Sequence, residues 1–165
     1  MFSILKSSIL NLVGGESLTC TFFGHREFAG DIKEMLTTTL SDLIILSGVD
    51  NFFVGNNGKF DRVVTETLRG LKKNYPHIRI STVSAYMPAG NSAEIFEDNV
   101  ELIYPEGLEL VPKRLAIVKR NEWMIEHSDV VVTYVTYVGG ASKFEALAKK
   151  RKKKVLNIAD MQKPL

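Results

Sequence analysis

Three short apolar runs in this chain each end at a glycine-bearing turn, and each turn leads into a segment with helical spacing. The turns are Gly24-His25-Arg26, Gly55-Asn56-Asn57-Gly58 and Gly139-Gly140-Ala141-Ser142. In a parallel α/β sheet the strand-to-helix turns lie at one edge, so these turns can converge on one crevice. Glycine lets the backbone approach a ligand closely, and helix N-termini offer free N–H groups to an anion. The pattern therefore predicts an α/β fold with a site for a phosphate-bearing small molecule.

The alternation of strand-like and helix-like segments predicts a doubly wound parallel sheet of about five strands. The strand-like runs cover residues 18–23, 51–54, 78–83, 129–135 and 155–158. Between the second and third runs the apolar residues recur at helical spacing and form one stripe: Phe60, Val63, Val64, Thr67, Leu68 and Leu71. Asp31, with Glu34 three residues later, predicts a capping box at the start of the first helix.

Residues 85–112 interrupt this alternation. They contain three prolines, two glycines and a stretch of six acidic residues between Glu94 and Glu109 with no basic residue among them. A loop of this length in a compact domain is usually functional. We expect a lid or a dimer contact here, and the sequence does not choose between them.

At 165 residues the chain predicts one domain over residues 18–165, with residues 1–17 as an N-terminal extension. The apolar run Ile9–Val13 is too short, and too interrupted by Asn11, for a secretory signal. No apolar stretch approaches the roughly 20 residues that span a bilayer, so no membrane partner is expected. The single cysteine, Cys20, lies in an apolar run and predicts a buried structural thiol. Without a disulfide framework, a cytoplasmic location is expected.

The formal net charge is only +2, but its distribution is uneven. Residues 1–110 carry 9 Lys/Arg and 14 Asp/Glu, whereas residues 111–165 carry 12 and 5. Residues 149–154 are six consecutive basic side chains. We interpret this run as a solvated helix end. A nucleic-acid face and head-to-tail self-association into a homo-oligomer are the alternatives.

The first two turns carry the polar candidates for a ligand site. Asn56 and Asn57 tolerate left-handed backbone, so the 55–58 turn can form an anion-binding nest, with Lys59 adding charge. Arg26 suits a phosphate or carboxylate, and His25 can donate a hydrogen bond or exchange a proton. The chain has no Walker loop, no Gly-x-Gly-x-x-Gly and no Gly-x-Ser-x-Gly elbow. Its three histidines lack metal-ligand spacing, so neither a metal nor a cofactor is expected.

Several short motifs, in order, resemble the SLOG superfamily over residues 18–159. They are Cys20-Thr21-Phe22-Phe23-Gly24-His25-Arg26, Phe53-Val54-Gly55-Asn56-Asn57-Gly58-Lys59-Phe60-Asp61-Arg62, Tyr104-Pro105-Glu106-Gly107-Leu108, Lys119-Arg120-Asn121-Glu122-Trp123-Met124, Ser128-Asp129 and Gly139-Gly140. That superfamily unites the Smf/DprA DNA-processing proteins with the LONELY GUY phosphoribohydrolases. The chain is most similar to its small YpsA/YspA-like members from bacteria and phages, whose function is unknown.

The resemblance implies a Rossmann-like sheet ordered 3-2-1-4-5 that binds a nucleotide or a nucleotide-derived ligand. It adds Arg120 and Asn121 to the ligand-binding candidates, which are then Gly24, His25, Arg26, Gly55, Asn56, Asn57, Gly58, Asp61, Arg120, Asn121, Gly139 and Gly140. The phosphoribohydrolases carry a Pro-Gly-Gly-x-Gly-Thr-x-x-Glu motif. Here Val138 stands in place of the proline, the Gly-Thr pair is missing and Glu145 falls one residue early.

Three functions are therefore weighed. The leading hypothesis is binding or sensing of a nucleotide-like small molecule. The alternative is hydrolysis of the N-glycosidic bond of a nucleoside 5′-monophosphate, with Glu145 or Asp61 as weak catalytic candidates, so whether the chain is an enzyme stays open. Nucleic-acid binding comes third and is expected to be unlikely, because the total charge is nearly neutral and no aromatic stacking platform is evident.

Overall fold

Six parallel strands form a single sheet in the computed structural model, which describes residues 16–89 and 100–162. Within those ranges the strands are β1 (Leu18–Gly24), β2 (Val49–Val54), β3 (Arg79–Val83), β4 (Val100–Ile103), β5 (Val130–Tyr134) and β6 (Lys154–Asn157). Their order is β4-β3-β2-β1-β5-β6, and every neighbouring pair is parallel. The predicted Rossmann-like α/β class is confirmed. The predicted strand count is wrong by one, because β4 extends the expected order at one edge.

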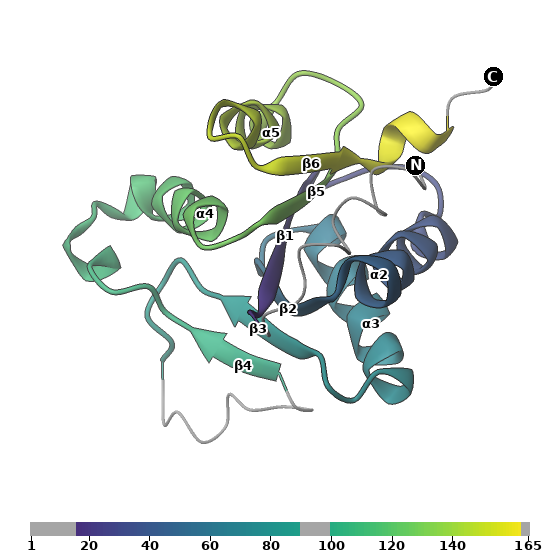
Figure 1. Cartoon of the computed structure of the whole chain (residues 1–165). Helices are drawn as coiled ribbons and strands as arrows, with labels where there is room; N and C mark the ends of the chain where they lie inside the picture. Colours follow the sequence, from purple (N-terminus) through teal and green to yellow (C-terminus); the bar gives the residue numbers. More distant parts are fainter. Residues whose placement is uncertain (1–15, 90–99, 163–165) are drawn as a thin grey trace.

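Helices cover both faces of the sheet (Figure 1). The helices α2 (Lys33–Ser47) and α3 (Lys59–Asn74) pack on one face, and α4 (Ala116–Glu126) and α5 (Gly140–Lys150) pack on the other. Three short 3₁₀ turns complete the described chain: η2 (Leu108–Leu110), η3 (Lys113–Leu115) and η4 (Ile158–Gln162).

Pairs of adjacent phenylalanines on the central strands show how the sequence builds two cores. Successive side chains of a strand point to opposite faces of the sheet. Phe22 and Phe52 therefore enter the core under α2 and α3, where their rings stack 6.2 Å apart. Phe23 and Phe53 enter the core under α4 and α5. Such two-sided burial is typical of the central strands of a parallel sheet.

The segment 85–112 is not a continuous loop. β4 lies within it as an edge strand and pairs with β3 through Ile80 and Val100. Only Val100 is buried in this strand, so its four residues carry little of the apolar signal that marks the central strands. Residues 90–99, with the acidic Glu94, Glu97 and Asp98, lie outside the described residues. The expected lid or dimer contact remains a prediction.

The start of α2 differs from the predicted capping box. The helix begins at Lys33, and the residue before it, Ile32, offers no side-chain cap. Asp31 instead accepts a hydrogen bond from the Lys33 backbone N–H at 2.9 Å. The helix ends at Gly48, whose φ of 71° is left-handed, as the sequence indicated.

Most of the predicted extension, residues 1–15, lies outside the described residues, and its separation from the domain remains a prediction. Ser17, the last residue of that predicted segment, donates a hydrogen bond to Asp50 on β2 at 2.6 Å. None of the helices in the described ranges has both the length and the apolar character needed to span a lipid bilayer.

Candidate functional site

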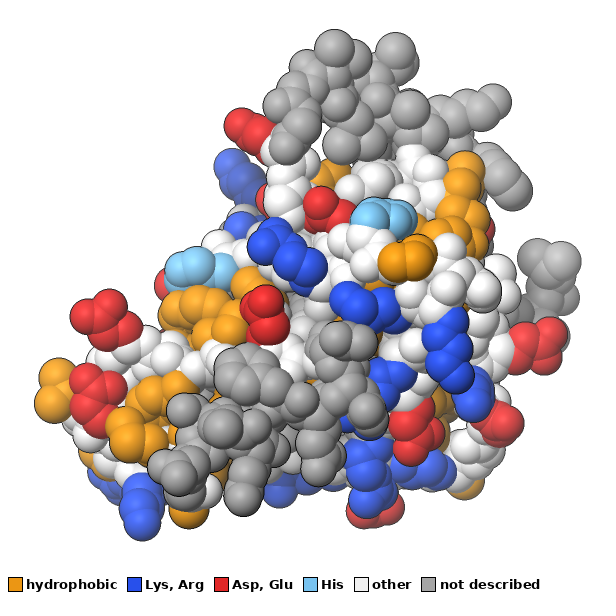
Figure 2. Space-filling model, turned by 90° about the horizontal axis from the view of Figure 1, so that it is seen from below, with side chains coloured by type: hydrophobic (Ala, Val, Ile, Leu, Met, Phe, Trp, Pro, Cys, Tyr) orange, Lys and Arg blue, Asp and Glu red, His pale blue; other side chains and the backbone are white. Residues whose placement is uncertain are grey.

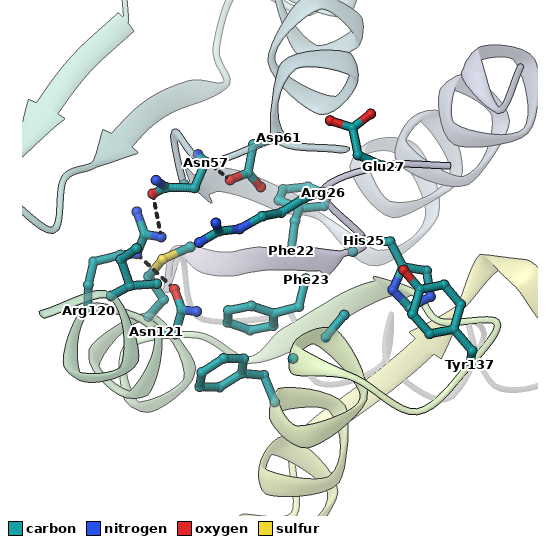
Figure 3. Close-up of a pocket in the computed structure, with 17 residues that line it drawn as sticks. Phe22, Phe23, His25, Arg26, Glu27, Asn57, Asp61, Arg120, Asn121 and Tyr137 are labelled. Carbon is teal, nitrogen blue, oxygen red and sulfur yellow. Dashed lines mark hydrogen bonds between the residues drawn. The ribbon is translucent and has the colours of Figure 1, made fainter. Parts of the chain in front are cut away.

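A cavity of about 470 Å³ opens at the carboxyl ends of β1, β2 and β5 (Figure 3). These three strands are neighbours in the sheet, so the turns that follow them meet at one edge. Nine of the twelve residues predicted to bind a ligand line this cavity: Gly24, His25, Arg26, Gly55, Asn57, Asp61, Arg120, Asn121 and Gly140. We call it the nucleotide pocket; that these residues bind a ligand remains a prediction.

Three predicted residues lie outside the lining. Gly58 precedes α3 with a φ of 103°, and a Cβ there would lie 2.8 Å from the Arg26 Cα, so this turn requires glycine. Gly139 precedes α5 in extended conformation, and its N–H is bonded to the Ser142 hydroxyl at 2.8 Å. Asn56 lines an adjoining cavity. Lys59 points away, because its ammonium donates to the Phe28 carbonyl at 2.8 Å.

Two glycines of the lining are fixed by close packing. A Cβ on Gly24 would lie 2.2 Å from the Phe60 ring, and one on Gly55 would lie 2.7 Å from the Asp61 carboxylate. The Gly55 position is also 3.2 Å from both terminal nitrogens of Arg120. Side chains of α3 and α4 therefore approach the ends of β1 and β2 so closely that only glycine fits.

Arg120 organises the polar part of the pocket lining. We call this part, which comprises Asn57, Asp61, Arg120 and Asn121, the polar wall. Its sequence neighbours on α4 are polar, which is typical of an exposed position. The residue is nevertheless only 2% exposed. Its Nε donates to Asn121 at 2.8 Å, one terminal nitrogen donates to the Val83 carbonyl at 2.8 Å and to Asn56 at 3.3 Å, and the other donates to Asn57 at 3.1 Å. Four of the five N–H donors of an arginine are thus used within the protein.

The arrangement around Arg120 also orients the three asparagines. Because their side-chain oxygens accept from the guanidinium, their amide NH₂ groups face elsewhere as donors. Arg26, in contrast, is exposed, and in the described part of the chain its side chain has no hydrogen bond or ion pair. Figure 3 shows it extending across the cavity toward Arg120 and Asn121. Arg26 is the cation that remains available to a ligand anion.

Asp61, on the first turn of α3, carries the one half-buried carboxylate of the polar wall. It accepts a hydrogen bond from the Asn57 backbone N–H at 2.9 Å. Burial raises the pKa of Asp61, while that hydrogen bond and the charges of Arg120 and Arg26 act in the opposite direction. Burial likewise lowers the pKa of Arg120, and the Asp61 charge opposes that shift. The second carboxylate of the lining, Glu27, is exposed at the rim.

Tyr137 adds an aromatic surface that the sequence did not reveal. Its ring stacks on the imidazole of His25 with centroids 3.7 Å apart, while the residue remains 57% exposed. The His25 Nε2 accepts a hydrogen bond from the Thr136 backbone N–H at 3.0 Å, which fixes the ring. Burial lowers the pKa of His25, so the neutral imidazole is favoured. The expectation that an aromatic platform is missing is therefore wrong.

Part of the pocket lining is apolar. Phe23 and Phe144 stack at 5.3 Å, and Ile117 and Met124 of α4 continue the same surface. Sequence reasoning did not assign these residues to a site, because apolar side chains at helical and strand spacing read as core. The pocket thus combines arginine and amide donors with aromatic and aliphatic surface, and Ile117 and Met124 flank Arg120 on one face of α4.

Glu145, one of the two weak catalytic candidates, does not line the pocket. On α5 it is the neighbour of Phe144, which faces the cavity, and it accepts hydrogen bonds from Thr133 of β5 and from Lys149. Asp61, the other candidate, does line the pocket. Cys20 is fully buried in β1, and burial raises the pKa of its thiol, as suits a structural residue. Among the described residues no group of His, Cys, Asp and Glu could hold a metal ion.

The basic run at 149–154 lies at the other edge of the sheet. It covers the end of α5 and the first residue of β6, whereas the pocket lies at the carboxyl ends of the strands. Lys149 pairs with Glu145, and Arg151 pairs with Glu126. The run therefore contributes no charge to the pocket lining.

The fold is similar to that of a solved DNA-binding protein. DNA processing protein A from Helicobacter pylori, for which a single-stranded DNA binding mode is described, matches with a TM-score of 0.56 at 20% sequence identity. The match covers 84% of this chain and 63% of that protein, so this chain spans less than two thirds of its length. No protein-family model matches the chain, and comparison with curated protein sequences gives no significant match.

This likeness supports the Smf/DprA side of the sequence resemblance at the level of fold. The SLOG superfamily as a whole and its YpsA/YspA-like members remain predictions. The expectation that nucleic acid is an unlikely partner is overturned, because the matching protein binds single-stranded DNA. That expectation relied on total charge and on a missing aromatic surface, whereas Arg26 and Tyr137 both line one cavity.

Proposed function

We propose that the chain binds single-stranded DNA and that the nucleotide pocket takes one of its nucleotides. The observation that carries this proposal is that one cavity is lined both by an exposed arginine, Arg26, and by an exposed stacked ring, Tyr137. In the described part of the chain the Arg26 side chain makes no hydrogen bond or ion pair. Arginine binds phosphate through a planar set of donors. Aromatic rings stack on bases of any sequence, and this combination is the usual design of single-strand binding sites.

Each wall of the pocket has a part in this proposal. The phosphate lies against Arg26, near the amide donors of Asn57 and Asn121 that Arg120 orients. The base stacks on the outer face of Tyr137, or enters toward Phe23 and Phe144. The close packing at Gly24 and Gly55 fixes the turns after β1 and β2, which form part of the pocket lining. The similarity in fold to a protein that binds single-stranded DNA supports the same partner.

Fluorescence anisotropy with a labelled 12-nucleotide oligo(dT) tests the proposal. We expect binding that weakens as salt rises, because phosphate contacts release counterions. Arg26→Gln should lower the affinity roughly tenfold and reduce the slope of log K against log salt by about 0.7. Lys73→Gln, which removes an exposed cation at the far end of α3, is the matched control. Absence of binding at 50 mM salt, or equal affinities for Arg26→Gln and Lys73→Gln, would refute the proposal.

A free nucleotide is the second candidate, and the size of the pocket favours it. A volume of about 470 Å³ lies within the range of small-molecule sites. Native mass spectrometry with a panel of mononucleotides, cyclic nucleotides and ADP-ribose derivatives separates the two proposals. A mononucleotide that binds at least as tightly as oligo(dT), and that is lost in Arg26→Gln, would identify the small molecule as the partner. Release of free base during the same incubation would show the glycosidase reaction.

A further inference from the structure

A second cavity, of about 260 Å³, adjoins the nucleotide pocket and shares Gly55 and Asp61 with it. It lies between α3 and the end of β3, on the other side of the 55–58 turn. Its remaining lining consists of six polar side chains: Asn56, Arg62, Thr65, Glu66, Arg69 and Thr82. We call it the α3 cavity.

Three residues of α3 turn donors toward this cavity. Arg62, Thr65 and Arg69 are spaced at i, i+3 and i+7, so they lie on one side of the helix. The Arg69 Nε is buried and has no hydrogen-bond acceptor among the described residues. A buried N–H without an acceptor is costly. Because protein atoms cover this nitrogen, a ligand in the cavity reaches Arg69 through its other atoms, which line the cavity.

The carboxylates of the lining do not neutralise these arginines directly. Glu66 is exposed, and no ion pair joins it to Arg62 or Arg69 in residues 16–89 and 100–162. Asp61 is turned toward the Asn57 N–H and the first pocket. Lys and Arg side chains are frequent in the right half of the face in Figure 2, on the side where Figure 1 shows α3. Among the described residues, neither guanidinium group is held in an ion pair, and both arginines line the cavity.

Arg120 connects the two cavities. One of its terminal nitrogens donates to the Asn56 oxygen at 3.3 Å, and the other donates to the Asn57 oxygen at 3.1 Å. Asn56 lines the α3 cavity and Asn57 lines the nucleotide pocket. The same guanidinium thus orients an amide donor on each side of the 55–58 turn.

From this geometry we propose that the α3 cavity is a second phosphate subsite, which holds the phosphate of the nucleotide adjacent to the one in the nucleotide pocket. Arg62, Arg69 and Thr65 bind its oxygens, and the amide of Asn56 adds a donor. The strand then passes over the turn at Gly55, the residue that, with Asp61, lines both cavities. This inference rests on the proposed binding of single-stranded DNA, and it fixes the path of the strand over the protein.

A set of oligo(dT) tetramers tests the inference, each with one linkage replaced by an uncharged methylphosphonate. On the wild-type protein, one position of the replacement should weaken binding roughly fivefold because it removes the phosphate at the α3 cavity. Arg69→Gln should weaken binding of the unmodified tetramer by a similar factor. The two changes should not add, because they remove the two sides of one contact. Arg69→Lys, which keeps the charge, should recover part of the affinity.

Two comparisons keep the outcome clear. Arg62→Gln removes an exposed side chain and should give the same non-additive result even if Arg69→Gln lowers stability in a thermal melt. Lys73→Gln should leave all tetramer affinities unchanged. If Arg62→Gln and Arg69→Gln both match Lys73→Gln while Arg26→Gln still weakens binding, the second subsite is wrong and the nucleotide pocket stands. If Arg26→Gln also has no effect, the proposed function itself fails.

Discussion

The phenol ring of Tyr137 lies parallel to the imidazole of His25, with centroids 3.7 Å apart and only 4° between the ring planes. His25 is 4% exposed and follows β1, whereas Tyr137 follows β5, so the contact joins two turns of the sheet edge. The buried imidazole supports the exposed phenol. Tyr137 is thereby held at the rim of the nucleotide pocket.

Removal of the Tyr137 ring should weaken single-stranded DNA binding without changing its salt dependence. We expect Tyr137→Ala to lower the affinity for oligo(dT) roughly tenfold, because stacking on one base is worth about 1–3 kcal/mol. Tyr137→Phe should bind like the wild type, since stacking needs the ring and not the hydroxyl. Anisotropy titrations at several salt concentrations measure both quantities. Equal losses in the two variants would contradict a stacking role.

Arg120 should matter for stability more than for direct ligand contact. Arg120→Lys loses most of the planar contacts to Val83, Asn56, Asn57 and Asn121. Arg120→Ala also removes the larger of the two arginine charges that act on Asp61. We expect each change to lower the free energy of unfolding by about 2–4 kcal/mol. Urea unfolding followed by circular dichroism measures this. Arg26→Gln, at an exposed arginine, should stay within about 0.5 kcal/mol of the wild type.

Asp61→Asn should strengthen DNA binding at neutral pH. The asparagine oxygen can still accept the Asn57 N–H, but the negative charge beside the phosphate is gone. We expect affinity to rise roughly threefold to tenfold at pH 7.5. Because burial raises the pKa of Asp61 above its ordinary 3.8, the folded protein binds this proton more tightly than the unfolded chain does.

The same pKa shift gives a test of stability against pH. The contribution of Asp61 to the free energy of unfolding is fully present below pH 3.8. It declines as the pH rises from 3.8 through the raised pKa of the folded protein. The free energy of unfolding of Asp61→Asn, measured in urea across that interval, should lack this decline. A decline of equal size in the variant and the wild type would contradict the assignment.

His25 should make the free energy of unfolding depend on pH in the opposite direction to Asp61, and at higher pH values. Its pKa is lowered from 6.5 by burial, so its contribution is fully present above pH 6.5 and is lost as pH falls through the lowered pKa. Protonation also removes the acceptor that Nε2 offers to the Thr136 N–H. His25→Gln should show less loss of stability between pH 7.5 and 5.5 than the wild type. His77→Gln, at an exposed histidine, controls for the loss of one imidazole.

Two glycine substitutions should change stability in opposite directions. Gly24→Ala places a methyl group 2.2 Å from the Phe60 ring, which calls for movement of a buried side chain and should cost about 1–3 kcal/mol or more. Gly70→Ala lies in the middle of α3 with no atom within 4 Å of the new Cβ. It should stabilise the protein by about 0.5–1 kcal/mol through helix propensity. Urea unfolding of both variants decides whether packing or backbone preference governs each site.

The sequence predicts much of this architecture because its central strands are strongly apolar. Phe22, Phe23 and the valines of β5 are buried on both faces, and the glycine turns that follow β1, β2 and β5 mark one edge. The sequence did not predict β4, because an edge strand with one buried residue lacks the continuous apolar run of the central strands. It lies among prolines and acidic residues, which favour a loop.

The site was harder to predict because its key relationships join residues far apart in sequence. Arg120 on a short helix looks like a solvated side chain until Asn56 and Asn57, more than 60 positions earlier, supply its acceptors. The resemblance pointed to Arg120, whereas nothing in the local sequence did. The orientation of the Tyr137 ring depends on the position of His25, which lies in another turn. Glu145 faces β5 because consecutive residues of a helix point in different directions, and its neighbour Phe144 faces the cavity.

The guanidinium of Arg120 contacts one asparagine in each cavity, and this shared contact has a thermodynamic consequence. In the proposed two-subsite mode, a ligand that shifts Arg120 in the nucleotide pocket also shifts the donor in the α3 cavity, so we expect the two occupancies to be linked. Such linkage is reciprocal: the factor by which filling one subsite changes the affinity of the other is the same in both directions. We therefore expect substitutions around Arg120 to change the affinities of both proposed subsites together.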